Sequence, residues 1–251
     1  MIALGLAVLM QLTPAALPSG PELSAVPFAV GEVLEYRGKF GFIPAGGATL
    51  SVLPSDTIRG IPSWKFSLTS GIKVNVGIFK FENSTTLLSW TGIDDFISRR
   101  FTKRLEENGK VRQEDFRIQP DSGFFRRNAD APRPTSKAPL DDVAFIYFLR
   151  TTPLALKRTY KYDRYFRSEK NPVTVEVLKR EVMELPDGTK VKCLVLHPVV
   201  DEPNGMFSKT SDARLWLTDD ARRIPVRIET TYNFGTVALI LKTVTLPHGA
   251  G

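Results

Sequence analysis

Cationic side chains are concentrated in one strand-like part of the chain. Residues 96–137 carry eleven Lys and Arg residues against six Asp and Glu residues. Apolar residues are interleaved with them, so both faces of a strand here would mix charged and apolar side chains. Because a buried, unpaired arginine is very costly, we predict that 96–118 forms long, protruding, partly solvated strands. Such cations could bind anionic groups.

Six residues form the candidate ligand-binding set. Four lie on the strand-like segment, where a period of two separates them into two faces, and two lie on a predicted helix. The six candidates are Arg99, Arg100, Lys103, Arg104, Tyr147 and Arg150. We expect their partner to be an anionic lipid or an acidic glycan, reached by peripheral contact with a membrane or an envelope polymer.

The sequence offers little that resembles a catalytic apparatus. It contains two histidines, His197 in an apolar strand and His248 near the end, and no G-x-S-x-G elbow for a nucleophile. It also lacks HExxH, CxxC, a calcium loop and a phosphate-binding glycine loop. We therefore predict no catalytic residues, no metal site and no cofactor. The sequence leaves open whether the protein is an enzyme and favours a non-catalytic protein.

Adjacent carboxylates leave one catalytic alternative open. They occur as four pairs: Asp94-Asp95, Glu106-Glu107, Asp141-Asp142 and Asp219-Asp220. Neighbours on a strand point apart, so no pair alone makes a glycosidase site, and each has a simpler role at a turn or helix cap. A carboxylate-dependent hydrolase acting on cell-envelope glycans would need two carboxyl groups from different elements to converge in a cleft.

The elements that must position these residues are mostly strands. VEVLKREV and ARLWLT alternate, and Asn108-Gly109 and Asp187-Gly188 are typical hairpin turns. We predict a mainly β fold: a curved antiparallel sheet or open barrel of about a dozen strands in two similar halves, with one short helix. The halves are 30–127 and 156–245, within a single β-rich domain over 28–245.

The two halves share an order of strands and turns. Trp90 and Trp216 are 126 positions apart, as are Gly109 and Gly235. The tryptophans are interpreted as anchors of two equivalent core positions, and the alternative is that they line a groove for an apolar ligand.

The linker 128–155 interrupts this rhythm. Asp141 and Asp142 suit a helix start, and apolar residues follow at helical spacing until Pro153. We predict a helix near 141–150 that packs on, or plugs, the concave side of the sheet.

The beginning of the chain resembles an export signal. Residues 1–16 contain an apolar run of eleven followed by small residues, and 17–27 form a Pro-rich spacer. We therefore expect a periplasmic or secreted protein without a transmembrane segment in its mature part. The net charge of +7 favours anionic partners, and export makes nucleic acid the poorest of them. The single cysteine, Cys193, is interpreted as a small core residue.

Three stretches resemble a known family. FAVGEVLEYRGKFGFIPAGGATLSV, DDVAFIYFLRTTPL and RLWLTDDARRIPVRIE, in that order, are similar to the exported bacterial family known as domain of unknown function 3108. The resemblance implies a secreted or periplasmic β-rich protein with no assigned activity and no catalytic residues to carry over. The last stretch is also similar to strand endings in periplasmic lipoprotein carriers, whose half-barrels hold acyl chains against a helical lid.

Three functional hypotheses follow. The first is a non-catalytic envelope protein that binds an amphiphilic ligand or an envelope partner on the curved sheet. The second is the carboxylate-dependent hydrolase, and the third is a purely structural scaffold. The concave face of the sheet distinguishes them. It would be apolar with a basic rim in the first case, would carry paired carboxylates in the second, and would be filled by side chains in the third.

Overall fold

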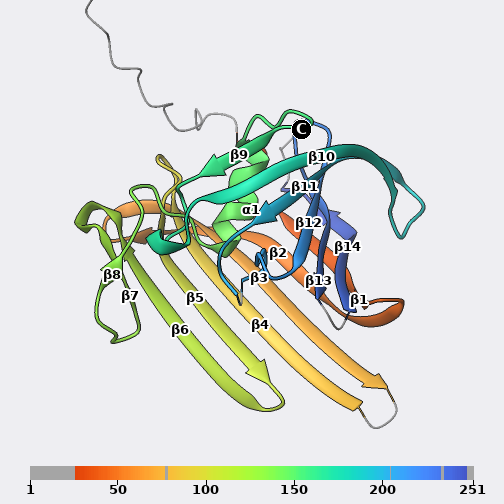
Figure 1. The fold of residues 1–251 in the computed structure, drawn as a ribbon, viewed down its shortest axis with the longest axis horizontal. Coiled ribbons are helices and arrows are strands. Elements are labelled where there is room, and N and C mark those ends of the chain that lie inside the picture. The colour runs from red at the N-terminus through yellow and green to blue at the C-terminus, as the bar shows by residue number, and fades with distance from the viewer. Residues whose placement is uncertain (1–25, 77–78, 204, 233–234, 248–251) are drawn as a thin grey trace, which may run out of the picture.

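One antiparallel sheet contains every strand of the described part of the chain (Figure 1). The computed structural model describes residues 26–76, 79–203, 205–232 and 235–247. The predicted signal peptide, and the spacer up to residue 25, lie outside them. The fourteen strands are β1 (Val33–Phe40), β2 (Ile43–Ile58), β3 (Ile61–Val76), β4 (Phe79–Gly92), β5 (Ser98–Glu107), β6 (Lys110–Gln119), β7 (Phe124–Arg127), β8 (Arg133–Pro134), β9 (Thr159–Tyr162), β10 (Val173–Glu184), β11 (Lys190–Val199), β12 (Asp212–Thr218), β13 (Pro225–Tyr232) and β14 (Gly235–Thr245).

The sheet is curved but not closed. Its order runs from β8 down to β1 and then from β14 down to β9, so pairing of β1 with β14 joins two meanders. The edges β8 and β9 are not paired with each other. Instead Leu140 forms a parallel bridge with Tyr165, and the Phe166 backbone N–H donates to the Leu140 carbonyl at 3.0 Å. The predicted mainly β, open antiparallel fold is confirmed.

The turns that set strand register carry the predicted chemistry. Asn108 and Gly109, between β5 and β6, both have positive φ, at 48° and 80°. A two-residue turn of this kind matches the twist of the flanking strands, which is why Asn-Gly is favoured there. It places Lys103 of β5 directly opposite Glu114 of β6, and both strands are ten residues long.

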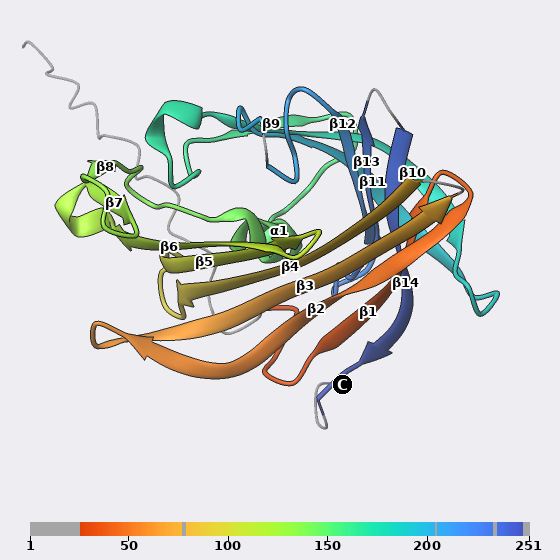
Figure 2. The same cartoon turned by 90° about the horizontal axis from the view of Figure 1, so that it is seen from below.

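Helix α1 (Asp142–Thr151) lies on the concave side of the sheet, between β4 and β9 (Figure 2). It begins one residue later than predicted. All of 143–150 is buried. Asp141 caps its first turn, accepting from the backbone N–H groups of Val143 and Ala144 at 3.0 Å each and from Ser89 Oγ at 2.7 Å. The cap therefore ties the helix to β4.

A buried ion pair holds the other end of the helix. Arg150 donates to both carboxylate oxygens of Glu32, at 2.6 and 2.9 Å, and both side chains are at most 1% exposed. The same guanidinium donates to the carbonyls of Pro27 and Arg222, at 2.9 and 3.2 Å. The helix end is thus joined to the start of the sheet and to the turn after β12.

The two tryptophans occupy comparable places in the two meanders. Each lies directly opposite an arginine of the next strand, with the guanidinium carbon 4.9 Å from the ring centroid: Arg100 at Trp90 and Arg227 at Trp216. Each tryptophan is only 6% exposed. This burial agrees with an anchoring role. That the halves 30–127 and 156–245 superpose stays a prediction.

The cap predicts a pH-dependent stability. Burial raises the pKa of Asp141 from 3.8 to about 6. The folded protein therefore binds this proton more tightly than the unfolded chain does, so the stability contributed by Asp141 is present near pH 4 and is lost as the pH rises through 6. Urea unfolding between pH 4.5 and 8 should show the Asp141→Asn variant gaining on wild type as the pH rises. Asp141→Ala, which cannot cap, should lose about 1–2 kcal/mol relative to Asp141→Asn. A wild-type minus Asp141→Asn difference that is flat across this range contradicts the assignment.

The buried pair predicts a coupling between distant residues. Arg150→Met leaves the Glu32 carboxylate buried without its partner, so unfolding should become easier by about 3–5 kcal/mol. Adding Glu32→Gln should recover part of this loss, giving a coupling of about 1 kcal/mol or more in a double-mutant cycle. The matched control is Arg180→Met, because Arg180 pairs with Asp219 while 60% exposed; it should cost less than about 1 kcal/mol. Additive single effects would show that the pair does not hold the helix.

Candidate functional site

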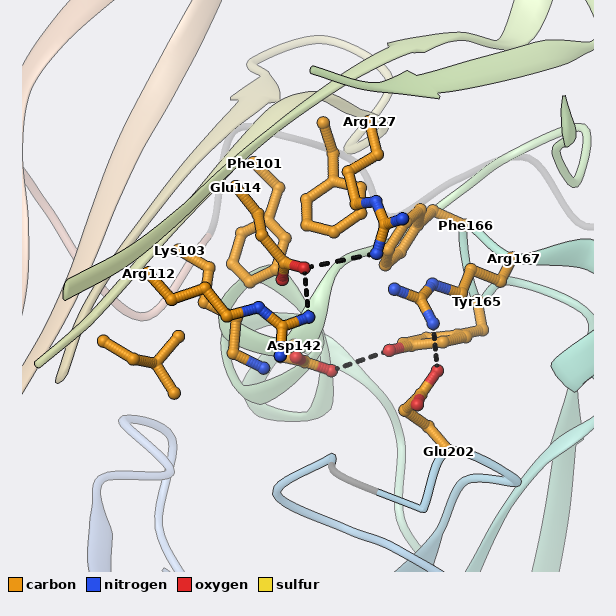
Figure 3. A pocket seen from close by; sticks show the side chains of 12 residues that line it. Phe101, Lys103, Arg112, Glu114, Arg127, Asp142, Tyr165, Phe166, Arg167 and Glu202 are labelled. Atoms are coloured by element: carbon orange, nitrogen blue, oxygen red, sulfur yellow. Dashed lines mark hydrogen bonds and ion pairs between the residues drawn. The ribbon is translucent and has the colours of Figure 1, made fainter. Parts of the chain in front are cut away.

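A cavity of about 420 Å³ opens where β5 and β6 pass the first turn of α1 (Figure 3). Three opposed residue pairs of these strands line it. The pairs are Phe101 with Phe116, Lys103 with Glu114, and Leu105 with Arg112. All six residues share one face because strand side chains alternate, and the Asn108-Gly109 turn sets their register. This wall of the cavity is aromatic at one end and charged toward the hairpin tip.

The opposite wall comes from distant parts of the chain. Asp142 is the first residue of α1, Tyr165, Phe166 and Arg167 follow β9, and Glu202 lies in the loop after β11. Figure 3 shows the charged and phenolic groups of both walls converging above the start of the helix. The segment after β9 is placed here by its bridge to Leu140, just before the helix.

Each carboxylate that lines this cavity already accepts from a neighbour. Glu114 accepts from Arg112 at 2.7 Å and from Arg127 at 3.4 Å. Arg167 donates to Glu202 at 2.6 Å.

Asp142 accepts from the Tyr165 hydroxyl at 3.1 Å. Burial raises the pKa of Tyr165 well above 10, which keeps this hydroxyl protonated as a donor. The carboxylates of the cavity are therefore engaged in structural contacts, which does not favour a free acid–base pair of the kind that a hydrolase needs.

Two of the residues that line the cavity carry a donor without a partner in the described part of the chain. Lys103 forms no ion pair or hydrogen bond within the described residues, although its side chain is half-buried. The Nε–H of Arg167 is buried and has no hydrogen-bond partner there either. Because the Nε–H of Arg167 is buried whereas the Lys103 side chain is partly exposed, the Lys103 ammonium is the donor that a ligand can reach.

An apolar cavity of about 250 Å³ adjoins the first. The two share Lys103, Leu105 and Asp142. The second cavity lies between strands β3–β5 and strands β13 and β14. Its apolar lining includes Leu68, Leu87, Met206, Ile228 and Leu239. A charged chamber and an apolar one therefore lie side by side, with Lys103, Leu105 and Asp142 lining both.

The structure separates the four predicted strand cations. Lys103 lines both cavities. Arg99 is buried against Asp95, and Arg100 binds both oxygens of Asp115, at 2.9 and 3.1 Å, on the face where it covers Trp90. Arg104 shares that face with Arg100 and is exposed. The long, partly solvated strands predicted for 96–118 are found.

The two predicted helix residues lie elsewhere. Tyr147 is fully buried and stacks on Phe66, with ring centroids 3.9 Å apart, and Arg150 is engaged by Glu32. Neither lines the two cavities. The residues that sequence reasoning missed are Arg112, Glu114, Arg127, Arg167 and Glu202. The first two could have been found by pairing β5 with β6 across the Asn108-Gly109 turn.

Other chemistry has little support in the described part of the chain. No group of three His, Cys, Asp or Glu residues there could hold a metal ion. Cys193 is buried, and this raises the pKa of its thiol to about 11, so it is poorly suited to act as a nucleophile. No helix among these residues is long and apolar enough to cross a membrane.

Comparison with known proteins agrees with the open, barrel-like architecture. The chain is similar to a solved structure described as a "beta-barrel-like protein of domain of unknown function DUF1849" from Brucella abortus. The TM-score is 0.61 at 8% identity, and the match covers 88% of this chain and 99% of that one. This likeness shows the fold alone.

A match to a family model identifies the family of the chain. The family described as "Protein of unknown function (DUF3108)" matches residues 35–242, so the chain belongs to that family, in agreement with the resemblance carried by its sequence. No curated protein matches the chain.

Proposed function

We propose that this chain is an exported, non-catalytic envelope protein that binds an amphiphilic ligand on the concave side of its sheet. The observation that carries the proposal is the junction of the two cavities at Lys103, Leu105 and Asp142. An amphiphile needs an apolar compartment and a polar one in direct succession, and ligand sites generally combine apolar walls with a few placed polar groups.

The buried helix supports the same proposal. Because α1 is fixed at Asp141 and at Arg150, its first turn can form a stable wall shared by both chambers. A purely structural scaffold would have no need for an apolar cavity next to unsatisfied cationic donors. The predicted periplasmic or secreted location fits a lipid-like ligand, and the predicted signal peptide carries this part of the proposal.

The apolar chamber can be tested with a fluorescent fatty acid. We expect 11-(dansylamino)undecanoic acid to bind the purified protein with increased dansyl emission. Leu239→Asp should weaken this binding about tenfold or more, because a carboxylate in the apolar chamber is costly to desolvate. Leu239 is half-buried, so the variant should still fold, which thermal unfolding will verify.

The matched control is Val182→Asp, which makes the same change at a residue of β10 that is 61% exposed. It should bind the probe as wild type does. Absence of probe binding to wild type, or equal binding by both variants, rejects the proposed function.

A further inference from the structure

The charged chamber is lined by more cations than carboxylates. Four cations line it, Lys103, Arg112, Arg127 and Arg167, against three carboxylates, Glu114, Asp142 and Glu202, so four minus three leaves a formal charge of +1. The carboxylates already accept hydrogen bonds, as described above. The unmet capacity consists of donors on cations, and the missing group must therefore be an acceptor with negative charge.

The position of the arginine is fixed by its surroundings. The Arg167 guanidinium carbon lies 5.5 Å from the ring centroid of Phe116 and 5.4 Å from that of Phe166, while Nη1 is held by Glu202. These contacts leave Nε–H as a buried donor without a partner among the described residues. Arg167 lines the charged chamber and not the apolar one, so it adds to the positive potential of the charged chamber without lying at the junction.

Lys103 connects the charge to the apolar chamber. Its side chain lines both cavities, and its neighbour Leu105 does so as well. An anion bound at the Lys103 ammonium would have the apolar chamber directly beside it. A free inorganic anion would leave that chamber unused.

We infer that the polar end of the ligand is a single oxyanion, a carboxylate or a phosphate ester, held by the Lys103 ammonium at the junction of the two cavities, on the side of the charged chamber. This rests on the proposed function and names the ligand class: a single-chain anionic amphiphile. The aliphatic part of the ligand occupies the chamber lined by Leu87, Met206 and Leu239.

Isothermal titration with decyl phosphate, decanol and inorganic phosphate tests the inference. Wild type should bind decyl phosphate about tenfold or more tightly than decanol, as expected for charge-assisted hydrogen bonds. Lys103→Met keeps the length of the side chain and breaks no ion pair described here, so it should fold normally. It should remove most of the preference for decyl phosphate and leave decanol affinity unchanged.

Two further variants sharpen the test. Arg104→Met removes a cation from the same strand on the opposite face and should change neither affinity. Arg167→Lys keeps a cation for Glu202 in the charged chamber, away from the junction, and should leave the preference for decyl phosphate in place.

The outcomes separate the inference from the function beneath it. Equal affinities for decyl phosphate and decanol, unaffected by Lys103→Met, overturn the oxyanion site and leave amphiphile binding intact. Inorganic phosphate binding as tightly as decyl phosphate, and losing affinity in Lys103→Met, supports the oxyanion site and rejects amphiphile binding. Failure of every probe to bind overturns both.

Discussion

A helix buried on all sides within a single curved sheet is the constraint on which the structure depends. Every residue of 143–150 is buried, including one arginine, so both polar ends of α1 must be satisfied by the sheet. Arg150 reaches Glu32, 118 positions earlier, and Asp141 accepts from Ser89 of β4. Because leaving either partner unmatched in the interior is costly, these contacts fix the helix to strands that are distant in sequence. They also bring the start of the sheet, the linker and the turn after β12 into one core.

The two cavities are a consequence of where that helix begins. Strands β3–β6 extend well beyond α1 (Figure 1), so the sheet near the hairpin tips is not filled by the helix. The inner faces of β5 and β6 there mix apolar and charged residues. Arginines neutralise Glu114 and Glu202. Among the cations of the charged chamber, Lys103 has no partner, and Arg167 has one N–H without a partner, in the described part of the chain. The helix thus fills one end of the sheet and leaves a chamber at the other end. The groups there that have no partner are cations.

Local patterns in the sequence predict much of this arrangement. Alternation, with one Asn-Gly and one Asp-Gly turn, indicates the antiparallel sheet. The acidic pair Asp141-Asp142 indicates the helix start, and a period of two places Lys103 with Phe101 and Leu105. Long-range partners are what local patterns cannot supply. Arg100 binds Trp90 and Asp115 on the outer face, and the register shift between Trp90 and Thr91 alters the alternation next to Arg99. Tyr147 and Arg150 are typical of one side of an amphipathic helix, but α1 is enclosed on every side. Arg167 and Glu202 meet β5 only through the bridge at Leu140 and the loop after β11, neither of which has a sequence signature.

We propose that the fixed helix and the protruding strands form one binding site with a cationic and an apolar end. A crystal structure of the protein with decyl phosphate bound tests it most directly. We expect a phosphate oxygen within hydrogen-bond distance of Lys103 Nζ, the alkyl chain against Leu87 and Leu239, and the Arg150–Glu32 pair intact. A ligand bound on the outer face of the sheet, or an alkyl chain that displaces α1 and breaks that pair, would show that the two cavities are not the binding site.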